Sequence, residues 1–88
     1  MTVVYKYPLR SPVVSVEMPD GGAIRLVARD PASVNPAIWV EHDLRQPAVR
    51  RTFLVFGTGM EVEAESTHVG SLIAGDYVWH VYERHRTA

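Results

Sequence analysis

The chain has 88 residues, a formal net charge of −1 and no cysteine. A chain this short buries only about 60 to 65 % of the surface that it exposes when unfolded, which leaves room for one core and excludes a second domain. Disulfides and thiolate-bound metals are excluded as well. Acidic and basic residues are mixed along the chain, so general nucleic-acid binding is not expected.

The N-terminal residues lack the pattern of an export signal. Lys6, Pro8 and Arg10 interrupt the first ten residues, and no apolar run approaches the roughly 20 residues needed to span a bilayer. We therefore expect a cytoplasmic protein without a membrane contact. Residues 1–83 are expected to form one β domain and residues 84–88 a flexible tail.

The first clear strand pattern lies between residues 13 and 27. Val14, Val16 and Met18 alternate with Ser15 and Glu17, which predicts a strand over 13–18 with one buried face. A Pro-Asp-Gly-Gly turn follows at 19–22, and alternation resumes over 24–27. This arrangement predicts a β-hairpin.

Two more strands are predicted in the middle of the chain. Residues 30–36 contain two prolines and are expected to form a loop, after which 37–42 alternate as a strand with Ile38 and Val40 on one face. The strand over 51–57 carries Phe53 and Val55 on one face and Leu54 and Phe56 on the other. Because little of the chain is left to cover both faces, we expect a homo-oligomer, most simply a dimer.

The last third begins with a Gly-Thr-Gly break at 57–59. The segment Glu61–Glu65 alternates glutamates with Val62 and Ala64, and both a first helical turn and an acidic edge strand fit that pattern. Short strands are predicted over 69–73 and 77–83, separated by a Gly-Asp turn. In the final strand Tyr77, Trp79 and Val81 share a face, and we expect Trp79 and Val81 to be core residues.

The fold class expected from these elements is all-β. Six to seven short strands at this spacing are typical of a small antiparallel sandwich or a partly open barrel. One short helical turn after Gly59 stays an open alternative.

Residue types needed for catalysis or metal binding are present without the necessary spacing. The four histidines, at 42, 68, 80 and 85, form no HxH or HxxxH pair, so we expect no metal site. No cysteine, GxSxG turn or phosphate-binding loop occurs. The chain is therefore expected to be no enzyme and to carry no cofactor.

The binding residues that we predict are polar groups near strand ends and strand faces. Arg50 and Arg51 point to opposite sides of an extended chain, so at least one should be free to bind an anion through two parallel hydrogen bonds. Thr58 lies between glycines that let a ligand approach, and His80 can donate beside Tyr82. The competing interpretation is that both arginines pair with the acidic run over 61–65.

Four segments resemble a known family. They are Ile38-Trp39, then Arg51-Thr52-Phe53 leading to Gly57-Thr58-Gly59, then His68-Val69-Gly70-Ser71, and last Val78-Trp79-His80-Val81-Tyr82-Glu83. In this order they resemble small, mostly uncharacterised bacteriophage and prophage proteins with an internal Thr-Gly step and a closing Val-Trp-His-Val-aromatic-Glu strand. Family members often continue Thr-Gly with histidine and proline, whereas this chain has Met60-Glu61-Val62, so a role that needs that histidine does not carry over.

The resemblance implies an accessory protein of a phage or prophage, acting in the host cytoplasm. We expect a non-enzymatic protein that works by stoichiometric binding. It would sequester a small anionic, nucleotide-like molecule of the host or of its defence, or block a host protein. The alternative is a structural or assembly module that only self-associates.

Overall fold

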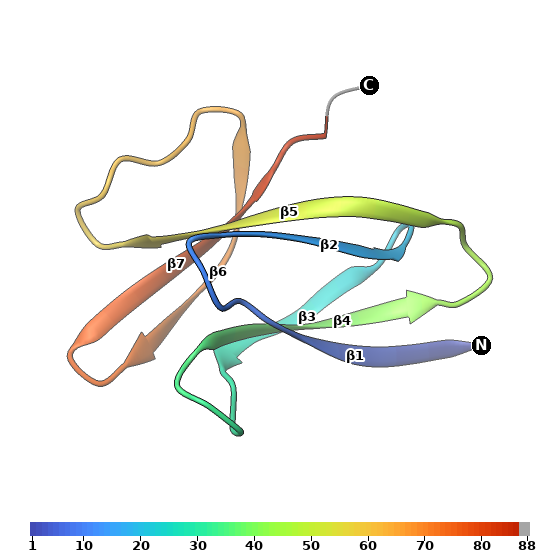
Figure 1. Cartoon of the computed structure of the whole chain (residues 1–88), viewed down its shortest axis with the longest axis horizontal. Helices are drawn as coiled ribbons and strands as arrows, with labels where there is room; N and C mark the ends of the chain where they lie inside the picture. The colour runs from blue at the N-terminus through green and yellow to red at the C-terminus, as the bar shows by residue number, and fades with distance from the viewer. Residues whose placement is uncertain (87–88) are drawn as a thin grey trace.

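The computed structural model describes residues 1–86, which form seven strands and no helix (Figure 1). The all-β fold class is confirmed. The strands are β1 (Thr2–Pro8), β2 (Val13–Pro19), β3 (Ala23–Arg29), β4 (Pro36–Asp43), β5 (Ala48–Gly57), β6 (Ser66–Ala74) and β7 (Tyr77–Arg84).

The strands form two antiparallel sheets that pack over a shared core. Sheet A has the order β1-β4-β3 and sheet B the order β2-β5-β7-β6. The fold is therefore sandwich-like rather than a closed barrel. The sheets meet most closely where β3 passes β6, and a Cβ atom on Gly70 would lie only 2.7 Å from Cγ2 of Val27.

The core is built from inward-facing residues of both sheets, as strand alternation predicts. Its buried members are Leu9, Met18, Ile38, Val40, Phe53, Leu72 and Val81. The prediction for Val81 is confirmed. Trp79 is half-buried and packs against this cluster.

The predicted hairpin over residues 13–27 is wrong. Both strands exist, but β2 pairs with β5 in sheet B and β3 pairs with β4 in sheet A. The turn at 19–22 carries the chain from one sheet to the other. It is held on the sheet B side by a hydrogen bond from the Asp20 amide to the Pro47 carbonyl. Gly22 packs so closely on His42 that a Cβ atom there would lie 2.6 Å from the imidazole.

Three further differences concern the loop after β5, the first strand and the C-terminus. Residues 58–65 form a loop, so neither the helical turn after Gly59 nor an acidic edge strand is present. Strand β1 was not predicted at all. The segment 84–88 was expected to be a flexible tail, but Arg84 is the last residue of β7 and the amide of His85 donates to the Glu65 carbonyl. Residues 87 and 88 lie outside the described range.

The outward face of β5 is covered by the chain itself. Leu54 points outward and is only 3 % exposed, and the loop over 58–65 returns across this face, where Glu63 bonds to Arg84 of β7. The apolar residues on both faces of β5 therefore need no second subunit to bury them, so the reason given for a dimer is wrong. Self-association itself stays a prediction.

Candidate functional site

The five predicted binding residues lie in different surroundings. Arg51 points into the space between the sheets, whereas Arg50, His80 and Tyr82 point outward from sheet B, as their places in the register require. Thr58 follows β5 in the loop and reaches His80. The structure thus brings together Thr58, His80 and Tyr82, and separates Arg51 from them.

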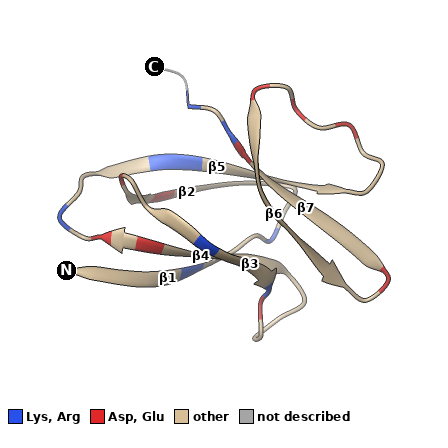
Figure 2. Cartoon of the chain, turned by 180° about the vertical axis from the view of Figure 1, so that it is seen from behind, with Lys and Arg blue, Asp and Glu red and all other residues tan. Residues whose placement is uncertain are grey.

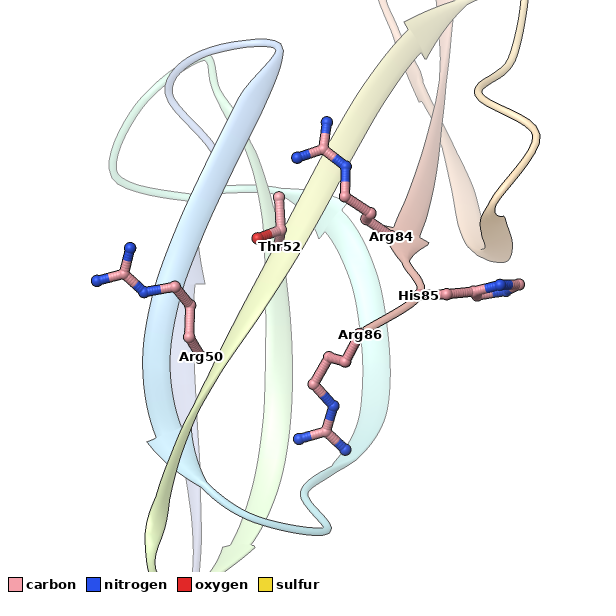
Figure 3. Close-up of a pocket in the computed structure, with 5 residues that line it drawn as sticks. All are labelled: Arg50, Thr52, Arg84, His85 and Arg86. Atoms are coloured by element: carbon pink, nitrogen blue, oxygen red, sulfur yellow. The ribbon is translucent and has the colours of Figure 1, made fainter. Parts of the chain in front are cut away.

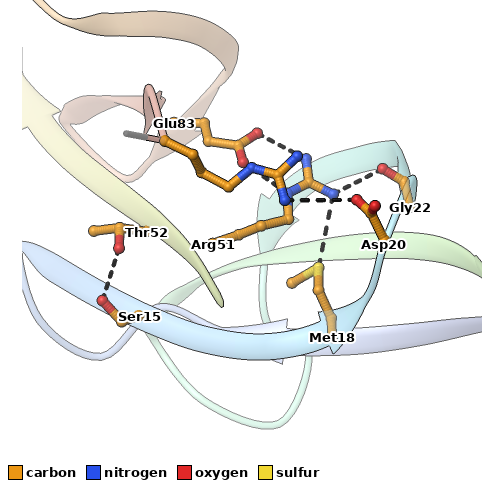
Figure 4. A network of polar contacts seen from close by, with 8 residues as sticks. Ser15, Met18, Asp20, Gly22, Arg51, Thr52 and Glu83 are labelled. Atoms are coloured by element: carbon orange, nitrogen blue, oxygen red, sulfur yellow. Dashed lines mark hydrogen bonds and ion pairs between the residues drawn. The ribbon is translucent and has the colours of Figure 1, made fainter. Parts of the chain in front are cut away.

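Arg51 is held by groups of the chain on all sides (Figure 4). Its Nε and one terminal nitrogen each donate to Glu83 at 2.7 Å, and the other terminal nitrogen donates to the Gly22 carbonyl at 2.8 Å. The guanidinium also lies 5.6 Å from the centroid of the Phe53 ring. The bidentate bond to Glu83 raises the pKa of Arg51. Arg51 therefore joins β5, β7 and the turn at 19–22, and its guanidinium group is not free to bind a ligand.

His80 is bonded on both sides of its ring. Nε2 lies 2.9 Å from the Thr58 hydroxyl and Nδ1 lies 2.8 Å from the Ser71 hydroxyl, which is itself 3.0 Å from Nε2 of His68. Tyr82 packs edge-on between Phe56 and His68, with ring centroids at 5.6 and 5.1 Å. A ligand would have to displace one of these hydroxyls before His80 could bind it.

A basic groove lies farther along the same outward face of sheet B. Its volume is about 330 Å³, and we call it the arginine groove; it is lined by Arg50, Thr52, Arg84, His85 and Arg86. The three arginines surround Thr52, while the His85 ring points away from Arg50 (Figure 3). Sequence reasoning placed only Arg50 here. Residues 84–86 were assigned to a tail, although three consecutive basic side chains were the available signal.

Each arginine of the groove has a carboxylate neighbour. Glu63 accepts two hydrogen bonds from Arg84, at 2.8 and 2.9 Å, and this pairing lowers the pKa of the Glu63 carboxyl. The other two pairs are looser, because the nearest nitrogen of Arg50 is 3.9 Å from Glu17 and that of Arg86 is 3.5 Å from Asp20. The competing interpretation, that Arg50 and Arg51 pair with the acidic run, is therefore wrong for both residues.

A larger, mostly apolar cavity adjoins the groove at Arg84. It has a volume of about 440 Å³ and lies between the loop and the outward side of β5, so we call it the loop cavity. It is lined by Pro12, Val13, Leu54, Val55, Phe56, Met60, Glu61, Val62, Glu63, Ala64 and Arg84. Figure 2 shows acidic residues spaced along this loop and basic residues where the chain leaves β7. The cavity lining thus carries both signs of charge, from Glu61 and Glu63 of the loop and from Arg84 of β7.

His42 is a buried histidine with an incomplete set of hydrogen bonds. It is fully buried, shares a 2.8 Å hydrogen bond with the Tyr7 hydroxyl through Nε2, and has no partner at Nδ1 within residues 1–86. Burial first, and then the positive charge of Arg51, lowers the pKa of His42 below its ordinary 6.5, while the Pro19 carbonyl opposes part of the shift. His42 is therefore neutral in the folded protein near pH 7.

This shift predicts that mild acid destabilises the protein. The unfolded chain takes up a proton at His42 below about pH 6.5 and the folded chain only at lower pH, so stability is lost as pH falls through that window, by at most about 1.4 kcal/mol per pH unit. Urea unfolding at pH 7.5, 6.5 and 5.5 measures how the free energy of unfolding depends on pH. His42→Phe should make that free energy less dependent on pH, and an unchanged dependence in this variant would assign the effect to other groups.

Residues 1–86 contain neither a cluster of metal-binding side chains nor a helix that could span a membrane. Within residues 1–86, no three histidine or carboxylate side chains lie close enough together to hold a metal ion. No helix of the described chain is long and apolar enough to cross a membrane.

Comparison with known proteins adds the family. No curated protein and no solved structure matches the chain. One family model, described as a domain of unknown function (DUF7352), matches residues 1–88. The phage origin implied by the resemblance stays a prediction. Because the match covers the full length of the sequence, the chain belongs to the DUF7352 family.

Proposed function

We propose that this protein acts by binding a small anion stoichiometrically, without catalysing a reaction, and that the arginine groove is the binding site. The observation that carries the proposal is that Arg50, Arg84 and Arg86 line one concave surface of about 330 Å³, although their guanidinium groups point in different directions and the Thr52 hydroxyl bonds to Ser15 (Figure 3). A guanidinium matches two oxygens of a phosphate or carboxylate, and several together select a ligand with more than one such group.

The carboxylates around the groove do not prevent binding. The Arg50–Glu17 and Arg86–Asp20 pairs are long, and both partners of each are about half exposed or more. Exposed ion pairs of this kind contribute only about 0 to 1 kcal/mol. A phosphate that bridges two arginines replaces them at little cost. The nucleotide-like ligand expected from the sequence is one member of this class.

Calorimetry with a panel of anions tests the proposal. We expect inorganic phosphate or a cyclic or linear nucleotide to bind with one site per chain. Arg50→Ala and Arg86→Ala should each weaken binding by about tenfold or more, since a hydrogen bond to a charged group is worth about 1.5 to 3 kcal/mol.

The matched control is Arg45→Ala. Arg45 is exposed, lies outside the groove and pairs with Asp43. It should leave the affinity unchanged. No heat from any member of the panel, or equal losses in all three variants, contradicts the proposal.

A second candidate is self-association without a ligand, and the turn between β6 and β7 favours it. Ile73 and Val78 pair on one face of this hairpin and are 78 % and 37 % exposed, and Tyr77 on the opposite face is 67 % exposed. Exposed apolar groups in a cluster often mark a protein interface. This surface also suits the blocking of another protein, including a host protein if the chain is phage-encoded.

Native mass spectrometry separates the two candidates, because it reads subunit number and retained ligand together. A small additional mass, one per chain, supports the anion-binding proposal. A bare oligomer that Ile73→Asp converts to a monomer supports self-association instead.

A further inference from the structure

The loop cavity and the arginine groove are neighbours, because Arg84 lines both. The groove supplies positive charge, while most of the cavity wall is hydrocarbon from β2, β5 and the loop, including Val13, Leu54 and Phe56. A volume of about 440 Å³ falls within the range of roughly 300 to 1,000 Å³ that is usual for small-molecule sites.

The pair between Glu63 and Arg84 shows which head group fits at the junction. Two parallel N–H···O bonds, of 2.8 and 2.9 Å, place a carboxylate flat against the guanidinium. Their side chains are 38 % and 43 % exposed, so the pair lies at the surface, where solvent weakens it. A carboxylate from a ligand makes the same two bonds when Glu63 moves aside.

The wall of the cavity favours a hydrocarbon over a nucleobase. Eight of its eleven lining residues have apolar side chains, and the polar ones are Glu61, Glu63 and Arg84. A base has several polar edge atoms to satisfy with these three side chains, whereas a hydrocarbon has none.

We infer that the protein binds an amphiphilic carboxylate, with its head on Arg84 in the place of Glu63 and its hydrocarbon tail in the loop cavity. This inference rests on the proposed function, and it names the ligand class of the same site. Glu63 then competes with the ligand, and the loop over 58–65 moves when the ligand enters.

A series of straight-chain carboxylates, used below their micelle concentrations, tests the ligand class. From acetate through hexanoate and octanoate to decanoate, affinity should rise about fourfold per methylene until the cavity is full, which is the gain expected for burying a CH₂ group. Octanol, which has the tail without the charge, should bind at least tenfold more weakly than octanoate. Amide NMR shifts on octanoate binding should include residues 54–56 and 60–64.

Glu63→Gln tests the competition. Removing the carboxylate that occupies Arg84 should tighten octanoate binding about threefold to fivefold, near the most that the loss of an exposed ion pair allows. Arg84→Lys should weaken it about tenfold by ending the bidentate contact. Asp76→Asn changes net charge equally at a distant turn and should change affinity less than twofold. Circular dichroism establishes that each variant is folded, and an unfolded Glu63→Gln leaves the chain-length series to decide.

Different results would contradict this inference and the proposed function. If phosphate or acetate binds at the groove but longer tails bring no gain, the inference is wrong and the proposed function stands. If octanoate binds equally well to Arg84→Ala and octanol binds like octanoate, the cavity takes apolar molecules without using the groove, and the carboxylate assignment is wrong. If no carboxylate and no phosphate binds, both proposals fall.

Discussion

Arg51→Ala should lower the free energy of unfolding by about 3 to 5 kcal/mol, the loss expected when one partner of a largely buried ion pair is removed. The side chain of Arg51 is 12 % exposed and that of Glu83 is 21 % exposed, and both oxygens of Glu83 accept from Arg51. The substitution leaves the Glu83 carboxylate between the sheets without its partner. It also leaves the Gly22 carbonyl without the donor that joins it to β5.

Urea unfolding measures this loss of stability in three proteins: the native chain, Arg51→Ala, and a double variant that carries Arg51→Met and Glu83→Leu. The free energy of unfolding should fall far less in the double variant than in Arg51→Ala, because apolar groups then replace both charges. Arg45→Ala is the matched control, since its pair with Asp43 is exposed and should contribute less than about 1 kcal/mol. A loss at Arg51 as small as that at Arg45 would mean that the pair does not stabilise the contact of β5 with β7 and the turn at 19–22.

Trp79→Ala should destabilise the protein by about 3 kcal/mol, at the lower end of the range for removing a large core aromatic residue, because Trp79 is half-buried. The indole packs against the core, and Tyr77 stacks on it at 5.9 Å between centroids. It also lies beside Gly57, where a Cβ atom would be 3.4 Å from the ring. The substitution thus opens a void over Gly57, on the core-facing side of sheet B.

Thermal unfolding followed by circular dichroism checks this second prediction. Tyr77→Ala is the control on the same face, and it should cost much less because Tyr77 is 67 % exposed. Cooperatively folded Trp79→Ala protein with an unchanged melting temperature would show that the indole makes no essential core contact.

The alternation of apolar and polar side chains located most strands, but it did not predict which strands pair with one another. Ile38 and Val40 alternate with Trp39 and Glu41 in the sequence, and β4 buries that predicted face. The turn at Pro19-Asp20-Gly21-Gly22 is compatible with a hairpin and with a crossing between sheets, and its residues are the same in both cases. The two cases differ in long-range contacts, namely the pairing of β2 with β5, the pairing of β3 with β4 and the bond from Arg51 to the Gly22 carbonyl, which no local pattern reveals.

The candidate site was harder to predict than the fold, because it depends on where the loop over 58–65 lies. Alternating glutamates there fitted two regular structures, but Glu63 instead returns over sheet B to Arg84. Arg50 was predicted because it and Arg51 point to opposite sides of an extended chain, which leaves at least one of them free for a ligand. Arg84 and Arg86 were missed because a charged C-terminus usually frays, and the contacts that hold them come from elements distant in sequence.

The central claim, that an anion binds in the arginine groove, is tested most directly by NMR of the arginine side-chain Nε–Hε groups during titration with phosphate and with octanoate. The signals of Arg84 and of Arg50 or Arg86 should shift together and saturate at one ligand per chain, while those of Arg51 and Arg45, which do not line the groove, should not move. Absence of any shift, or equal small shifts of every arginine, would contradict the claim.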